Sequence, residues 1–307
     1  MKKAALFIAF LGFIAQAQQK PEIKKTDVIR IETELASDKM EGREIFQPGN
    51  QLASAFIENE FEKAELSHYA ELKNFRQEFT AKGKAANNVI GIIPGKSKRD
   101  EYVVFSAHYD HLGVKESGQD KVYNGANDDA SGVTAMISLA KYFKQLNNNE
   151  RTIIFVAFTG EEVGGFGAAY FSKNIDADKV VAMFNIEMIG TESKWGKNSA
   201  YITGFDKSDF GTILQQNLKG SPFHFEPDPY PKEQLFYRSD NARLAYLGVP
   251  AHTISTSKMD SEPNYHKLSD EVSTLDLENM TEIIKSIAVS SQSIISGKDT
   301  PTRVKKE

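Results

Sequence analysis

The sequence predicts an α/β fold, a three-layer sandwich with a mixed, mostly parallel central sheet and helices on both faces. Three observations predict it. From about residue 85, short apolar or β-branched runs recur, helix-type segments separate several of them, and each run ends at a polar or glycine-rich stretch. Strands that alternate with helices are typical of a parallel sheet covered on both faces. A chain of 307 residues is long enough to bury a sizeable core,.

The first 17 residues have the pattern of a signal peptide. The basic start MKK precedes the apolar run AALFIAFLGFI, and Ala15-Gln16-Ala17 is a small-x-small cleavage site,. The apolar run is too short for a permanent transmembrane helix, and a buried first helix is the alternative interpretation. We expect cleavage after about Ala17, a periplasmic or secreted mature chain, and no integral membrane segment in that mature chain.

Residues 18–298 are expected to form one domain, because no internal repeat or interior linker divides them. Its first part, about 26–66, is predicted to be helical. DVIRIETELASD and GNQLASAFIENEFEKAEL carry apolar residues at helical spacing,. The stretch KMEGREIFQPGN between them is typical of a loop,. The charged tail 299–307 is expected to fray.

The remaining elements follow in order along the chain. The expected strands are NVIGIIPG, YVVFSAH, TIIFVAFTG, VAMFNIEMIG, AYITG and GVPAHTIS,. The expected helices are ASGVTAMISLAKYFKQL, FGAAYFSKN, DFGTILQQNL, SDNARLAYL and TLDLENMTEIIKSIAVSSQSII,.

Composition excludes some classes of partner and ligand. The formal net charge is −5 and no dense Lys/Arg stripe occurs, so nothing indicates a nucleic-acid partner,. The chain contains no cysteine, so it forms no disulfide, and any metal must be held by His, Asp or Glu,. The composition leaves the oligomeric state open.

Polar residues, most of them histidine or carboxylic acids, occur in five separate segments, most of which follow apolar runs. They are His108 and Asp110; Asp128 and Asp129; Glu161 and Glu162; Glu187; and Tyr265, His266 and Asp270. The carboxyl ends of strands are where sites form in open α/β sheets, and acids gathered there repel one another unless a cation lies among them. Imidazole and carboxylate without thiolate suit zinc, with manganese or cobalt as substitutes. Each segment alone has a plainer explanation, such as a helix N-cap for NDDASG, but all five in order favour a metal site.

These segments, HYD, GANDDASGV, FTGEEVGGFGAAYF, NIEMIG and YHKLSD, together resemble the co-catalytic zinc aminopeptidase family. That family includes secreted bacterial leucine-type aminopeptidases, the peptidase domain of glutamate carboxypeptidase II, the transferrin receptor and glutaminyl cyclases. The resemblance runs from roughly Leu35 to Asp270 and includes LASDKMEGRE and SDNARLAYLGVPAHT. It implies that the domain at 18–298 is a metallopeptidase domain.

The resemblance also implies a role for each residue of the expected site. The implied zinc ligands, for two ions per chain, are His108, Asp128, Glu162, Glu187 and His266, with Asp128 bridging both ions. Glu161 is the implied general base and Tyr265 the implied stabiliser of the oxyanion. The implied supporting acids are Asp110, Asp129 and Asp270, with Asp110 orienting His108 and Asp270 supporting His266. A non-proline cis peptide is expected after Asp128.

Three positions depart from this pattern or are left open by it. Glu187 stands where the best-known members of the family have Asp, and its extra methylene displaces the carboxylate by about 1.5 Å unless the backbone retreats. His111 is interpreted as a supporting or surface residue. Arg238 either faces a substrate carboxylate or pairs with Asp240.

The function implied by the resemblance is removal of N-terminal residues from peptide substrates, by a metal-bridged hydroxide with Glu161 as general base. Two alternatives stay open on the sequence. One is a single-zinc acyltransferase like the glutaminyl cyclases. The other is a catalytically inactive binding protein on the same scaffold. Side-chain preference, and the choice between aminopeptidase, dipeptidase and carboxypeptidase activity, also stay open.

Overall fold

The computed structural model describes residues 21–306, and the predicted signal peptide lies outside this range. None of the helices in this range is long and apolar enough to cross a bilayer.

The elements follow the predicted alternation of strands and helices. The strands are β1 (Ser67–His68), β2 (Arg76–Ala81), β3 (Lys84–Ile93), β4 (Lys98–His108), β5 (Arg151–Phe158), β6 (Val180–Ile186), β7 (Ser199–Ile202), β8 (His224–Pro227) and β9 (Ala251–Ser255). The α-helices are α1 (Lys25–Leu35), α2 (Pro48–Lys63), α3 (Ser131–Leu146), α4 (Phe166–Lys173), α5 (Phe210–Asn217), α6 (Asn241–Ala245), α7 (Leu277–Ser290) and α8 (Gln292–Ile295). Short helical turns are η1 (Asp38–Arg43), η2 (Ala126–Ala130), η3 (Phe205–Lys207), η4 (Leu235–Tyr237) and η5 (Val272–Thr274).

The sheet is mixed and mostly parallel at its centre, as predicted. Within residues 21–306 its order is β1-β3-β5-β4-β6-β9-β7-β8, and β2 pairs with β3. β5, β4, β6 and β9 are mutually parallel neighbours. The antiparallel pairs lie toward the edges, where β3 meets β5 and β7 meets β9. The carboxyl ends of the four central strands therefore lie at one edge of the sheet.

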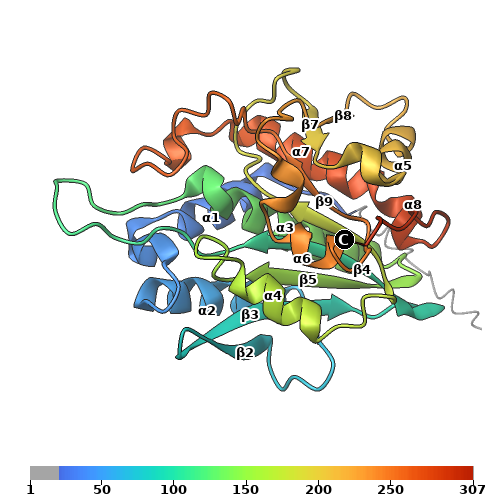
Figure 1. Ribbon diagram of the computed structural model, residues 1–307, viewed down its shortest axis with the longest axis horizontal. Coiled ribbons are helices and arrows are strands. Elements are labelled where there is room, and N and C mark those ends of the chain that lie inside the picture. Colours follow the sequence, from blue (N-terminus) through green and yellow to red (C-terminus); the bar gives the residue numbers. More distant parts are fainter. Residues whose placement is uncertain (1–20, 307) are drawn as a thin grey trace, which may run out of the picture.

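Helices cover both faces of this sheet, which confirms the predicted three layers. On β4, Phe105 packs into the core formed with α1, α2, α3 and α7, whereas its neighbour Val104 packs into the core formed with α4 and α6. This alternation follows from the two-residue period of a strand. Figure 1 shows α4 and α6 in front of the sheet and α3 behind it. Both faces of the central strands are buried, which is why these strands have near-continuous apolar sequences.

The helical N-terminal part is fastened to the site edge by a buried arginine. Arg43, at the end of η1, is fully buried, and in the described part of the chain its guanidinium donates only to backbone carbonyls. The acceptors are Tyr109 O at 2.9 Å, Leu35 O at 2.7 Å, Asn124 O at 2.6 Å and Gly125 O at 2.9 Å. Because a buried guanidinium needs all its donors satisfied, Arg43 holds the N-terminal segment against the loop that leads into η2.

The expectation that the C-terminal tail frays is wrong for residues 299–306. Val304 is 4% exposed, and its N–H donates to Gly248 O. The buried Arg151 of β5 donates to Asp299 O and to Thr300 Oγ1. Charged composition predicts solvent exposure on average, but the buried Pro301 and Val304, together with hydrogen bonds from both the backbone and the side chains of the tail, dock it on the domain.

Candidate metal centre

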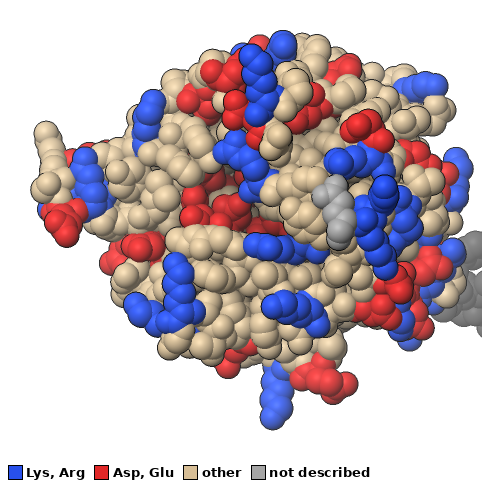
Figure 2. All heavy atoms as spheres, in the orientation of Figure 1, with Lys and Arg blue, Asp and Glu red and all other residues tan. Residues whose placement is uncertain are grey.

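The predicted site residues come together at the carboxyl ends of the central strands. His108 is the last residue of β4, Glu161 and Glu162 follow β5, and Glu187 follows β6. Asp128 lies in η2, and His266 lies in the loop between β9 and η5. Figure 2 shows Asp and Glu atoms on the floor of a hollow at the centre of this face, with Lys and Arg atoms beside it.

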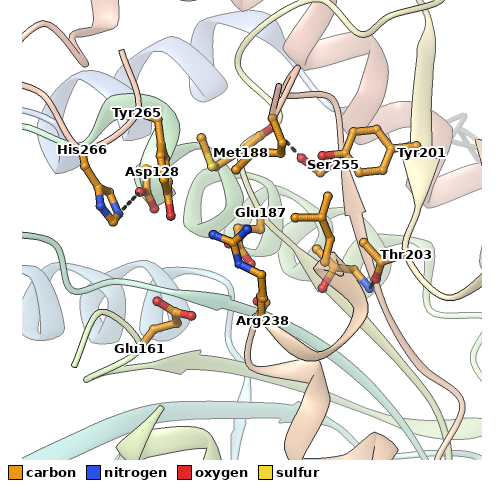
Figure 3. Close-up of a pocket in the computed structure, with 14 residues that line it drawn as sticks. Asp128, Glu161, Glu187, Met188, Tyr201, Thr203, Arg238, Ser255, Tyr265 and His266 are labelled. Atoms are coloured by element: carbon orange, nitrogen blue, oxygen red, sulfur yellow. Dashed lines mark hydrogen bonds and ion pairs between the residues drawn. The ribbon is translucent and has the colours of Figure 1, made fainter. Parts of the chain in front are cut away.

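Asp128 lies between two histidines that are far apart in the sequence. Its Oδ1 is 3.3 Å from His108 Nε2, and its Oδ2 is 3.2 Å from His266 Nε2 (Figure 3). The peptide bond after Asp128 is cis, as the sequence resemblance implied. Burial raises the pKa of Asp128, but the close ion-pair contacts with the two histidines outweigh burial and lower the pKa below its ordinary value. Each oxygen of this carboxylate therefore faces a different imidazole.

Glu162 faces the same centre through both of its oxygens. Oε2 is 3.1 Å from His266 Nε2, and Oε1 is 2.8 Å from Nδ1 of His111. Burial raises the pKa of Glu162, yet its contacts with these histidines bring the pKa below its usual value. Burial likewise opposes the charged form of His108, but Asp128 and nearby acids raise the pKa of this histidine well above 6.5.

Glu161 lies beside this centre but is not bonded to it. Its carboxylate makes no hydrogen bond to any residue in the described range, and it lines a pocket together with Asp128, Glu187, Tyr265 and His266. We call this space the central pocket. Burial raises the pKa of Glu161 well above its ordinary value, in the opposite direction from Glu162. Two neighbouring carboxyl groups thus have contrasting environments, which is typical of acids with different roles.

Tyr265 and Glu187 complete the lining nearest the histidines. The Tyr265 ring stacks on the His266 ring with centroids 3.9 Å apart, and its side chain points into the central pocket (Figure 3). Glu187 Oε2 accepts a hydrogen bond from Asn185 at 3.4 Å. Burial raises the pKa of Glu187 above its ordinary value, while the nearby His108 lowers it.

The three supporting acids hold backbone N–H groups around the centre. Asp129 accepts from the N–H groups of His108, Gly132 and Met188. Asp110 accepts from the N–H groups of Glu161 and Glu162 at 3.2 and 3.4 Å, and its Oδ1 is 3.9 Å from Nδ1 of His108. These acids fix the segments that carry the candidate ligands.

Asp270 differs from the role expected for it. Its two oxygens accept from the N–H groups of Asn127 at 2.8 Å and Asp128 at 3.0 Å. The structure gives it no hydrogen bond to the His266 ring within residues 21–306. Asp270 therefore supports the η2 loop and not the His266 ring, because the loop between β9 and η5 folds over the start of η2.

His111 is a functional candidate that sequence reasoning undervalued. It is 1% exposed, and its Nδ1 lies 2.8 Å from Glu162 and 3.9 Å from Asp128. One ring nitrogen of His111, one carboxylate oxygen of Asp128 and one of Glu162 lie close enough together to hold a metal ion. A Cβ at Gly125 would lie 2.5 Å from this ring, so glycine is required there,. The sequence signal for His111 was the HxxH spacing in HYDH. At the end of a β-strand this spacing does not show by itself which way the second histidine points, because that depends on its neighbours in the fold.

Arg238 and Asp240 also differ from the sequence interpretation. Arg238 Nη1 pairs with Glu233 Oε2 at 3.2 Å, and the structure shows no ion pair with Asp240 in the described range. Asp240 is 3% exposed, and neither of its carboxylate oxygens has a hydrogen-bond partner among residues 21–306. Burial raises the pKa of Asp240 to about 8.

The chemistry of the donor set fits zinc. Three buried atoms at the centre, His108 Nε2, His111 Nε2 and Asp128 Oδ2, have no hydrogen-bond partner in residues 21–306. Buried polar atoms are normally satisfied, so such a cluster indicates a missing partner that accepts lone pairs. Imidazole nitrogens and carboxylate oxygens without a thiolate are zinc-type ligands, and manganese or cobalt can also bind them.

Comparison with known proteins places the chain in a family. Residues 88–290 match the model of peptidase family M28. The chain belongs to peptidase family M28. The matched range contains His108, Asp128, Glu162, Glu187 and His266, and it leaves the helical N-terminal part outside.

A curated relative is similar to this chain over part of its length. A probable leucine aminopeptidase of Trichophyton verrucosum is 29% identical over 208 residues, which cover 64% of this chain and 54% of that protein. The chain spans about half the length of this curated relative.

Two solved structures share the fold. A zinc aminopeptidase from Bacillus subtilis superimposes with a TM-score of 0.70 at 13% identity, covering 92% of this chain and 98% of that one. A glutaminyl cyclase from Porphyromonas gingivalis superimposes with a TM-score of 0.68 at 15% identity, covering 90% of this chain and 100% of that one. At these identities the likeness concerns the fold alone.

Proposed function

We propose that this chain is a zinc-dependent aminopeptidase that removes N-terminal residues from peptides in the periplasm or outside the cell. The observation that carries the proposal is the position of Asp128, whose two oxygens face two different histidines, His108 and His266. A carboxylate in this position is suited to hold two metal ions at once, one with each histidine. The basic and apolar N-terminal pattern supports export,.

The proposed ligands for two zinc ions are His108, Asp128, Glu162, Glu187 and His266. Zinc bound in such a site lowers the pKa of water and polarises the scissile carbonyl. Asp110, Asp129 and Asp270 keep these segments in place through the backbone N–H groups described above. His111, in contact with Glu162, orients that carboxylate.

Two residues of the chain are proposed to act directly in the reaction. The Glu161 carboxylate has no hydrogen-bond partner in the described range and lines the central pocket, so it is free to take a proton from water and deliver it to the leaving amine,. The Tyr265 hydroxyl in the same pocket is suited to donate to the oxyanion,. Glu187 lies across the pocket from them, where its carboxylate can receive the free α-amine of a peptide.

The test combines metal analysis with substrate screening. We expect the purified protein to contain two zinc ions per chain and to release N-terminal residues from a peptide library, read by mass spectrometry. Chelator should abolish this release, and added zinc should restore it.

The two alternatives predict different results in the same test. One zinc per chain with pyroglutamate formation on N-terminal glutaminyl peptides would indicate a cyclase. Zinc binding without turnover of any peptide would indicate an inactive binding protein. Release of C-terminal residues would indicate a carboxypeptidase.

A further inference from the structure

The central pocket extends beyond the candidate metal centre, and one side of it is lined by a positively charged side chain. Arg238, between η4 and α6, is the only Lys or Arg among the described residues that line it. Figure 3 shows its guanidinium reaching into the middle of the ring of labelled side chains, with Thr203 on the side away from Asp128. Because Glu161 and Glu187 also line the pocket, Arg238 is the group there that can attract a negatively charged part of a ligand.

Three of the six hydroxyl groups that line the pocket donate their protons to protein acceptors. The bonds are Tyr201 Oη to Ser257 O at 3.0 Å, Thr253 Oγ1 to Asn241 Oδ1 at 3.0 Å, and Ser255 Oγ to Met188 O at 3.1 Å. Thr203 differs, because its Oγ1 accepts from the N–H of Thr253 at 3.1 Å and donates to no residue within 21–306. Thr203 therefore keeps an unused donor, which complements a ligand group that only accepts hydrogen bonds,.

Arg238 keeps most of its donors unused. Only Nη1 is engaged, with the carbonyl of Glu233 at 3.3 Å and its Oε2 at 3.2 Å. Nε and Nη2 have no hydrogen-bond partner in the described part of the chain. Both side chains of the pair are about half exposed, at 45% for Arg238 and 40% for Glu233. An ion pair this exposed contributes little and is easily exchanged for another carboxylate.

We propose that Arg238 binds a carboxylate of the peptide substrate, with the Thr203 hydroxyl as a further donor in the same pocket. The inference rests on the proposed peptidase function and names its substrate class. A guanidinium presents two parallel N–H groups that match the two oxygens of a carboxylate. The carboxylate comes either from an N-terminal Asp or Glu side chain or from the free C-terminus of a short peptide.

The test compares charged substrates with neutral isosteres in the zinc-loaded full chain. The first arm measures kcat/KM for the p-nitroanilides of Glu and Gln, and the second measures it for Ala-Ala and its C-terminal amide. The variants are R238Q, R238K and K232Q. Lys232 is an exposed residue of the same loop that does not line the pocket, so K232Q controls for the loss of one positive charge.

The expected result is a preference of the wild type for the carboxylate in one arm, which identifies its source. That preference should fall roughly 10- to 100-fold in R238Q, which is the factor that a charge-assisted hydrogen bond contributes. The loss should appear mainly in KM, turnover of the neutral substrate should be retained, and R238K should keep part of the preference. K232Q should match the wild type.

Two outcomes overturn the inference and are distinguishable. Equal charged-to-neutral ratios in wild type and R238Q in both arms, with neutral substrates still hydrolysed, overturn the role of Arg238 alone. Absence of metal-dependent turnover on every substrate overturns the proposed peptidase function and the inference with it.

Discussion

Glu161 and Glu162 are neighbours in sequence but meet different surroundings. They follow β5, and Asp110 accepts hydrogen bonds from the N–H groups of both residues. The Glu162 carboxylate faces His111 and His266, whereas the Glu161 carboxylate faces the central pocket. The backbone is thus held by one acid while the two side chains diverge. This arrangement lets one carboxylate hold a cation while the other stays free for proton transfer.

Substitution of each glutamate separates these two roles. We expect E161Q to keep its zinc and lose roughly 10²- to 10⁴-fold in kcat, the contribution typical of a general base. E162Q should lose zinc, because it removes a charged ligand. Zinc content by elemental analysis and kcat on the same preparations provide the measurement. An E161Q variant with wild-type turnover would show that Glu161 is not the base.

A second prediction at the level of single residues concerns His111, which contacts the carboxylate of Glu162. We expect H111A to weaken zinc binding about 10- to 100-fold, as is usual when a residue that orients a metal ligand is removed. Competition with a chromogenic chelator measures the affinity. The control is H224A, since His224 is exposed on β8. Equal zinc affinity of H111A and the wild type would contradict the assignment.

At the scale of elements, one carboxylate connects three helices. Glu60 of α2 pairs with Arg30 of α1 at 2.6 Å, with Lys63 of its own helix at 3.0 Å, and with Lys141 of α3. Its side chain is fully buried. Burial raises the pKa of Glu60, but the three cations outweigh burial and lower the pKa from 4.5 to about 2. The packing of α1 and α3 on α2 therefore includes an ionic contribution that depends on pH.

This pKa shift predicts the pH dependence of stability. Because the folded-state pKa of Glu60 is below the unfolded value, its contribution is complete above pH 4.5 and disappears as the pH falls toward 2,. We expect E60Q to lose on the order of 2 kcal/mol of unfolding free energy at pH 7, discounted for the exposure of its partners. Urea unfolding at several pH values should show the difference shrinking below pH 4.5. E62Q, at an exposed position of α2, is the control, and a difference independent of pH would refute the explanation.

At the scale of the whole molecule, the two ends of the described chain are both held by buried arginines. Arg43 binds carbonyls that flank the metal-site loop, and Arg151 binds carbonyls of Ile294 and Asp299 near the C-terminus. Arg303 of the tail donates to Val180 O at the start of β6. Segments outside the central sheet are thus part of the fold and not appendages.

Removal of the tail tests this conclusion. We expect a chain ending at Lys298 to lose about 3 kcal/mol of unfolding free energy, because Val304 leaves the core and the buried Arg151 loses two acceptors. Denaturant unfolding measures the loss. The exposed Lys305 and Lys306 offer a control, since their joint substitution by Ala should change stability little,. A truncated chain as stable as the full chain would mean that the tail contacts contribute nothing.

The sequence by itself determined the α/β class, the order of the main strands and helices, and the residues that gather at the strand ends. These features depend on local periodicity and on polar residues that follow apolar runs, which are readable in adjacent positions. It did not reveal the short strand β2, whose residues RQEFTA alternate too weakly in character to be distinguished from a loop. Recognition of the family came from motif order, not from spacing alone.

Only the tertiary structure decided which distant residues touch. It brought His111 to Glu162, moved Asp270 from His266 to the η2 loop, paired Arg238 with Glu233, and docked the tail on Arg151. Apart from the local Arg238–Glu233 pair, these contacts join residues far apart in sequence. These contacts form only once the strand order and the paths of the loops across the sheet are set. Neither feature can be read from residues that are neighbours in the sequence.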